Sequence, residues 1–106
     1  MEKKRIYISG PISGHDLGER REAFAKVKRI LETMEYEVVN PLENGLPPNS
    51  TTNDHMRRDI ELLMSCDEIY MMSKWTHSAG CKLEFDIATA IGLPVRFEQI
   101  FTVEFV

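Results

Sequence analysis

The sequence predicts an α/β fold in which helices cover both faces of a mainly parallel sheet of four to five strands. Short β-prone runs alternate along the chain with longer stretches whose apolar residues recur at helical spacing. Gly and Pro residues mark the junctions between these stretches. This alternation, with a strand at both ends of the series, is typical of parallel sheets joined by right-handed crossover helices.

The first strand and the first helix are predicted within residues 5–35. Residues 5–9 form a short β-prone run that Gly10 and Pro11 end. Asp16 is followed three residues later by Glu19, which is the spacing of a capping box, so a helix is expected from about residue 17 to residue 35. Its expected core face is apolar and consists of Ala23, Val27, Ile30, Leu31 and Met34.

The second strand is predicted over residues 37–40, because Pro41 disfavours a continuation. A polar, Pro-rich loop follows over residues 42–51, where a lid could form. Thr52 or Asn53 is expected to cap the second helix. The apolar stripe of that helix is narrow and consists of Met56, Ile60 and Leu63.

The third strand is predicted over residues 68–72, and a third helix follows that ends at Gly92. The expected core face of this helix consists of Leu83, Ile87, Ala90 and Ile91. Residues 94–97 complete the series as a fourth strand. In the tail, Phe101, Val103 and Phe105 alternate with polar residues, which favours either a subunit contact or a cover for the small core.

Length and composition indicate one domain over residues 1–106, since 106 residues with 42% hydrophobic content suit a single compact core. There is no apolar run of about 18 residues, which a membrane helix needs, and no apolar signal region follows the charged start. A cytoplasmic location without membrane attachment is therefore expected. A net charge of −4 without a basic cluster argues against a nucleic-acid polymer and favours a small-molecule ligand.

Cysteine and histidine spacing argues against a metal site. Cys66 and Cys81 show no CxxC pattern and are expected to be reduced core thiols. His15, His55 and His77 lack the spacing of zinc ligands, although His77 could contact a base. No metal is therefore expected.

Three loops should meet beyond the carboxyl ends of the strands, where parallel sheets bind ligands: residues 10–14, the segment from Pro41 onward, and residues 73–78. Two of them hold candidate anion-binding turns at the start of a helix, with Gly10, Ser13 and Gly14 in one and Ser78, Ala79 and Gly80 in the other. The first turn matches neither a Walker A sequence nor GxGxxG, which disfavours ATP hydrolysis.

Glu84 is the main candidate for chemistry. It lies four residues after Gly80, early in the predicted third helix. Helical side chains lean toward the N-terminus, and Gly80 has no side chain that would cover the carboxylate. Glu84 is therefore expected to meet a ligand at the mouth of the sheet.

Three segments together resemble the nucleoside 2-deoxyribosyltransferase family: Tyr7-Ile8-Ser9-Gly10-Pro11-Ile12-Ser13-Gly14, then Arg58-Asp59-Ile60-Glu61-Leu62-Leu63 with Asp67, then Ser78-Ala79-Gly80-Cys81-Lys82-Leu83-Glu84. The likeness extends in order to about Pro94 and is greatest to the short branch that includes the 2′-deoxynucleoside 5′-monophosphate N-glycosidases and small bacterial and phage relatives. It implies a flavodoxin-like, Rossmann-like three-layer fold and a homodimer or larger homo-oligomer. It also implies cleavage of an N-glycosidic bond with neither metal nor organic cofactor.

The resemblance implies a role for each matching residue. Glu84 matches the nucleophile, Asp59 the sugar-contacting or proton-handling aspartate, and Tyr7 the tyrosine beside the nucleophile. Ser78 and Gly80 match the loop that holds a 5′-phosphate in the monophosphate branch. The residue types suit the reaction, because a carboxylate can stabilise or trap the oxocarbenium-like sugar that forms when the base departs.

The chain departs from the family pattern in two places. Ser13 stands where the monophosphate branch has an arginine. Arg20, Arg21 or Arg58 could replace that arginine, although solvated helix charges are the favoured interpretation of each. The interval 78–83 lacks the additional acid of the true transferases, and the tail lacks the polar residue that they lend to a neighbouring subunit. Hydrolysis is therefore favoured over transfer.

Each candidate also has a structural interpretation. Glu84 could be an ordinary helix carboxylate, Asp59 could pair with Arg58, Tyr7 could only pack in its strand, and Ser78 could only cap a helix. Met72 and Trp75 could line a base slot or pack as core.

The alternative functions are a non-catalytic nucleotide-binding or sensing module and a small structural protein. Convergence of Glu84, Asp59 and Tyr7 in one pocket favours the enzyme, whereas a salt-bridged Glu84 on a covered face favours the module.

Overall fold

The computed structural model describes residues 2–47 and 49–99 and confirms the predicted α/β class. One sheet contains four strands, all parallel, in the order β2-β1-β3-β4. The strands are β1 (Arg5–Ser9), β2 (Glu37–Val39), β3 (Glu68–Met71) and β4 (Val95–Phe97). The order reverses between β1 and β3, because the chain first moves outward to β2 and then returns to the other side of β1. This is a flavodoxin-like arrangement.

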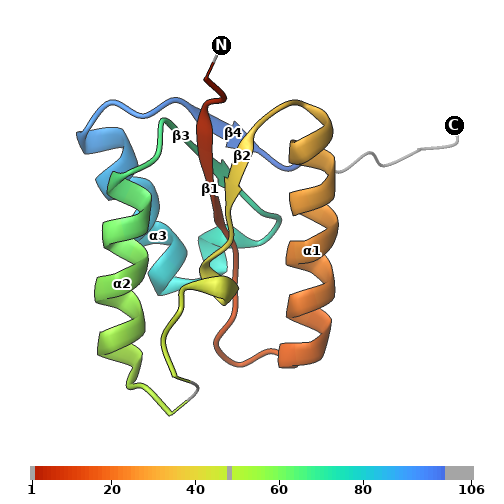
Figure 1. The fold of residues 1–106 in the computed structure, drawn as a ribbon. Coiled ribbons are helices and arrows are strands. Elements are labelled where there is room, and N and C mark those ends of the chain that lie inside the picture. The colour runs from red at the N-terminus through yellow and green to blue at the C-terminus, as the bar shows by residue number, and fades with distance from the viewer. Residues whose placement is uncertain (1, 48, 100–106) are drawn as a thin grey trace, which may run out of the picture.

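The three helices lie on both faces of the sheet, with α1 on one face and α2 and α3 together on the other (Figure 1). The reversal of strand order explains this division, since right-handed crossovers made in opposite directions put their helices on opposite faces. The helices are α1 (Leu17–Thr33), α2 (Thr52–Met64) and α3 (Ala79–Ala90), and two short 3₁₀ turns, η1 (Pro41–Glu43) and η2 (Trp75–His77), follow β2 and β3.

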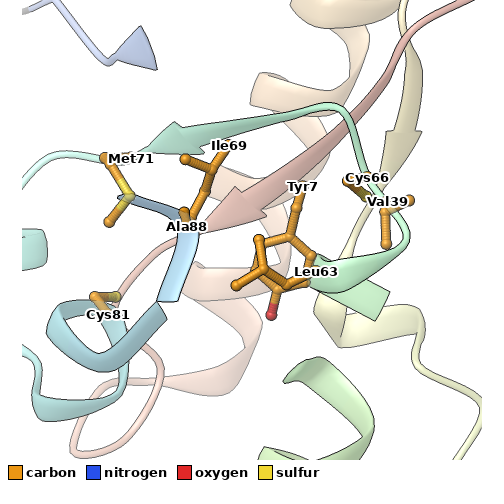
Figure 2. Packing of buried hydrophobic residues seen from close by; sticks show 8 residues of the cluster. All are labelled: Tyr7, Val39, Leu63, Cys66, Ile69, Met71, Cys81 and Ala88. Carbon is orange, nitrogen blue, oxygen red and sulfur yellow. The ribbon is translucent and has the colours of Figure 1, made fainter. Parts of the chain in front are cut away.

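The core consists of two apolar clusters, one on each face of the sheet. Because side chains of a strand alternate between its faces, Ile6 and Ile8 of β1 pack on the α1 side with Phe24, Val27, Leu31, Tyr36 and Met72. Tyr7 points to the opposite side (Figure 2), where the cluster also contains Val39, Leu63, Cys66, Ile69, Met71, Cys81 and Ala88. β1 is therefore buried on both faces, as expected for a central parallel strand.

The helix caps differ from prediction in detail. Asp16 caps α1 as predicted, and its carboxylate accepts hydrogen bonds from the backbone of Gly18 and Glu19. The Glu19 side chain does not complete a capping box, because it pairs with the Arg20 guanidinium. Thr51 caps α2, one residue before the predicted position, and forms a full capping box with Asp54.

The predicted core faces of two helices were partly wrong. In α3 the buried residues are Cys81, Glu84 and Ala88, whereas Leu83 and Ile91 are 42% and 48% exposed and Ala90 is also exposed. The buried face thus includes a carboxylate, which an apolar pattern cannot reveal, and this shifts the phase of the helix. In α1 the buried residues are Phe24, Val27 and Leu31, while Ile30 and Met34 lie on an exposed flank.

Helix and strand ends agree with prediction to within two residues. α1 ends at Thr33 rather than residue 35, and α3 ends just before Gly92, which has a positive φ of 80°. The apolar alternation predicted at Phe101, Val103 and Phe105 lies outside the described residues. None of the helices in the described ranges is both long enough and apolar enough to cross a membrane.

Candidate functional site

A cavity of about 690 Å³ opens at the carboxyl ends of the strands, next to the point where the strand order reverses. Its walls come from β1 and the loop after it, the start of α1, the segment after β2, one face of α2 and the first turns of α3. All predicted site residues except Gly14 line it: Tyr7, Gly10, Ser13, Asp59, Ser78, Gly80 and Glu84. Gly14 is not among the lining residues and has a positive φ of 80° in the turn that precedes α1.

Glu84 is 7% exposed and lies at the inner wall of this cavity, where two hydroxyl groups hold its carboxylate. The Tyr7 hydroxyl donates to Oε2, and the Ser9 hydroxyl donates to Oε1 over 2.8 Å. Tyr7 and Ser9 are two residues apart in β1, so they point to the same face of the sheet. Within the described part of the chain, Glu84 forms no salt bridge.

The pKa of Glu84 reflects opposing influences. The net effect is a rise from 4.5 to about 7, caused mainly by burial and in smaller part by the negative charge of nearby Asp59. The hydrogen bonds from Tyr7 and Ser9 act in the opposite direction, because they stabilise the ionised form. Burial and the neighbouring Glu84 raise the pKa of Tyr7 well above its usual value, so the phenol stays protonated and remains a donor. Near neutral pH, Glu84 is therefore divided between its acid and its anion.

Asp59 of α2 is the second carboxyl group of the cavity. Burial raises the pKa of Asp59, whereas a hydrogen bond from Asn44 and the charges of His55 and Arg58 lower it. Asn44 Nδ2 donates to Asp59 Oδ1 over 3.0 Å. The structural alternative, an Arg58–Asp59 pair, is not formed, because Arg58 instead donates to the Asn44 carbonyl and to Glu61.

Comparison with known proteins adds one finding. Residues 4–97 match the model of a family described as a domain of unknown function, DUF4406. The chain belongs to the DUF4406 family. No curated protein matches the chain. The description assigns no activity to DUF4406, so the cavity carries the functional information.

The two turns predicted to bind an anion both reach the cavity of this DUF4406 domain. Ser78 caps α3, and its hydroxyl accepts a hydrogen bond from the Cys81 backbone over 3.3 Å. Of the three arginines considered as replacements for a loop arginine, only Arg21 lines the cavity. Arg20 is engaged by Glu19 and the Pro11 carbonyl. Arg21, Ser13 and the start of α3 thus contribute polar and cationic groups to the lining of the cavity.

Of the two alternatives for Met72 and Trp75, a base slot or core packing, this DUF4406 domain shows core packing. Met72 is buried in the core on the α1 side. Trp75 packs against Phe85, with ring centroids 4.7 Å apart, and against Phe97 at 6.0 Å. Neither residue lines the cavity, because η2 turns the Trp75 ring toward α3 and β4.

The two cysteines lie in the core. Cys66 and Cys81 are free and buried, which confirms the prediction of reduced core thiols, and burial raises the pKa of both. Across residues 2–47 and 49–99 of the DUF4406 domain, no three His, Cys, Asp or Glu side chains are grouped so that they could hold a metal ion.

The sequence did not predict that Ser9, Asn44 and His55 belong to the site. Ser9 follows Tyr7 by two residues in one strand, and His55 precedes Asp59 by four residues in one helix, so both shared a face with a predicted residue. Asn44 offered no such signal. Its side chain contacts His55 and Asp59, which lie 11 and 15 residues further along the chain, only because the segment after β2 folds against α2.

Proposed function

We propose that this domain cleaves the N-glycosidic bond of a 2′-deoxynucleoside or its 5′-monophosphate, with Glu84 as the nucleophile. One observation carries the proposal: Glu84 is buried at the wall of the cavity, held by Tyr7 and Ser9, with Asp59 nearby. The sequence resemblance to the nucleoside 2-deoxyribosyltransferases supports the same assignment. A buried carboxyl with a perturbed pKa beside a second carboxyl is typical of catalytic sites.

The reaction follows from these groups. An oxygen of ionised Glu84 forms a bond to C1′ of the sugar while the bond from C1′ to the base nitrogen breaks, and the base nitrogen keeps the electron pair. The departing base takes up a proton from solvent. Water then attacks C1′ of the ester, so its hydroxyl stays on the sugar and Glu84 is released as a carboxylate. The Asp59 carboxylate takes the remaining proton of this water and passes it to solvent.

Polar and cationic groups in the cavity lining suit the anionic part of such a substrate. Ser13, Arg21 and the start of α3 at Ser78 and Gly80 would meet a 5′-phosphate through a guanidinium and helix N–H groups. Hydrolysis is favoured over transfer, because no further acid precedes Glu84 in α3. Self-association stays a prediction from the resemblance and is checked by sedimentation equilibrium.

Free base, measured by chromatography after incubation with deoxynucleosides and their monophosphates, tests the proposal. Glu84→Gln keeps the size of the side chain but removes the nucleophile, so base release should fall about a thousandfold or more. Glu22→Gln, a change at an exposed position of α1, is the matched control. Undiminished release in Glu84→Gln would contradict the nucleophile. Ligand binding by the wild type without base release would identify a non-catalytic binding module instead.

A further inference from the structure

The orientation of the Asn44 side chain is fixed by three hydrogen bonds. Its Oδ1 accepts from the Leu46 backbone N–H over 3.1 Å, and a backbone N–H can only donate. The amide nitrogen must therefore be the atom that faces Asp59 Oδ1 and His55 Nδ1, each 3.0 Å away. Asn44 is 7% exposed, and Arg58 Nε donates a hydrogen bond to its backbone carbonyl oxygen over 3.1 Å. The residue therefore has little freedom to turn.

This orientation decides the tautomer of His55. An amide nitrogen has two N–H groups and no acceptor, so Asn44 donates one hydrogen to Asp59 and the other to His55. His55 Nδ1 must therefore carry no hydrogen, and neutral His55 carries its hydrogen on Nε2. Within the described residues, Nε2 makes no hydrogen bond, and His55 lines the cavity. His55 is thus prepared to donate from Nε2 to a ligand.

The surroundings of His55 differ from the wall at the start of α3. Helix α2 begins beyond the carboxyl ends of the strands and runs back along the sheet (Figure 1). His55 lies one turn before Asp59 in this helix, and both line the cavity. Leu46 and Met56 line the cavity beside Asn44 and His55 and add apolar surface. A fixed donor within an apolar wall suits a flat ring that carries a few polar atoms, which describes a nucleobase.

We propose that Asn44 is a positioning residue that holds His55 as an Nε2–H donor to the base of the bound nucleoside, next to the Asp59 carboxyl. The inference rests on the proposed function for the identity of the ligand. The acceptor on the base is a ring nitrogen or a carbonyl oxygen. Negative charge grows on the base as the bond to C1′ breaks, so a donor fixed in advance stabilises the transition state more than the ground state.

The tautomer is tested without any substrate. In ¹⁵N NMR spectra of histidine-labelled wild type, neutral His55 should carry its hydrogen on Nε2. Asn44→Asp replaces the donor with an acceptor, so the hydrogen should move to Nδ1. Asn53→Asp, at an exposed position of α2, should leave the tautomer unchanged. A wild-type hydrogen on Nδ1, or a tautomer that does not respond to Asn44→Asp, would overturn the inference.

Two substitutions of His55 separate donation to the base from support of Asn44. In His55→Gln the amide nitrogen takes the position of Nε2, whereas in His55→Asn the amide oxygen takes the position of Nδ1. We expect His55→Asn to lower kcat/KM for base release about tenfold or more, which corresponds to one lost hydrogen bond, and His55→Gln to recover most of it. The opposite order would overturn the donor role.

A binding measurement separates failure of this inference from failure of the proposed function. The probe is deoxyadenosine monophosphate, added to labelled wild type and to the same protein with Glu84→Gln. We expect the His55 Nε2 signal to shift on binding in both. If the shift occurs without base release, the proposed chemistry fails and the donor role stands. If base is released while the Nε2 signal stays unchanged, the donor role fails and the chemistry stands.

Discussion

The proposed role of Glu84 requires both a shielded position and an ionised carboxylate, and burial opposes ionisation. Burial gives the carboxyl a shielded place beside the cavity but favours its neutral form, which cannot attack a sugar. Tyr7 and Ser9 restore part of the ionised form, since each donates a hydrogen bond to a different oxygen. The resulting pKa of about 7 leaves the proposed nucleophile partly ionised at neutral pH.

The two hydroxyl donors should therefore set the pH dependence of base release. The rate should rise with pH through a midpoint near 7, as Glu84 ionises. Tyr7→Phe and Ser9→Ala each remove a hydrogen bond that lowers the pKa of Glu84, so the midpoint should move upward by on the order of one pH unit. Tyr70→Phe, on the other face of the sheet, is the control. Profiles of kcat against pH measure the midpoints, and an unchanged midpoint in both variants would contradict this account.

The raised pKa of Glu84 should also make the free energy of unfolding depend on pH. Folded Glu84 keeps its proton up to about pH 7, whereas the unfolded side chain loses it near 4.5. The folded state therefore binds more protons between these values, and its stability falls as the pH rises through them. The displacement corresponds to about 3 kcal/mol.

Glu84→Gln does not titrate and should gain about this amount relative to wild type between pH 4 and pH 8, as measured by urea unfolding. Glu22→Gln, at an exposed position, provides the comparison and should show no such change. If the difference between Glu84→Gln and wild type were the same at every pH, the raised pKa would be refuted.

At the scale of elements, α2 and α3 bring the candidate carboxyl groups together. They pack side by side on one face of the sheet, with Asp59 on α2 and Glu84 on α3, and the pKa of Glu84 responds to Asp59. Strand and helix order could be predicted from periodicity, because turn residues and helical spacing are local signals. The rotation of each helix could not, because the buried face of α3 includes Glu84, whose hydrogen-bond partners lie 75 and 77 residues away in β1.

The contact between α2 and α3 makes Gly80 informative. A Cβ at this position would lie 3.3 Å from Met56 Cε, the end of a flexible side chain that can move. Gly80→Ala should therefore raise stability by up to about 1 kcal/mol, since alanine favours a helix over glycine. The same change pushes Met56 toward the cavity, so substrate affinity should fall.

Urea unfolding and KM for base release measure the two effects of Gly80→Ala separately. Met56→Ala removes the contact, so in a protein that carries this change Gly80→Ala should no longer lower the affinity. A change in stability without a change in KM would show that Gly80 does not shape the ligand site.

At the scale of the whole molecule, the carboxyl end of the sheet holds the cavity, and the amino end holds a network around a buried carboxylate. The cavity lies at the carboxyl ends of the strands, whereas a buried carboxylate at the amino end, Glu68, joins several elements. Glu68 accepts hydrogen bonds from Tyr36 over 2.7 Å and from Arg96 over 3.2 Å, and Lys4 lies 3.9 Å away. Lys4 and Tyr36 directly precede β1 and β2, and Arg96 lies in β4, so the Glu68 side chain links all four strands away from the cavity.

Glu68→Ala should accordingly lower stability while leaving the chemistry intact. It leaves the Tyr36 hydroxyl without its acceptor and should cost about 2 kcal/mol, measured by urea unfolding. Glu37→Ala removes an exposed carboxylate 3.7 Å from Arg5 and should cost less than about 1 kcal/mol, as surface pairs do. At a temperature where both variants are fully folded, their kcat/KM for base release should equal that of wild type. A large loss of kcat/KM in folded Glu68→Ala would mean that the amino end of the sheet controls the geometry around Glu84, and the division of tasks between the two ends would be wrong.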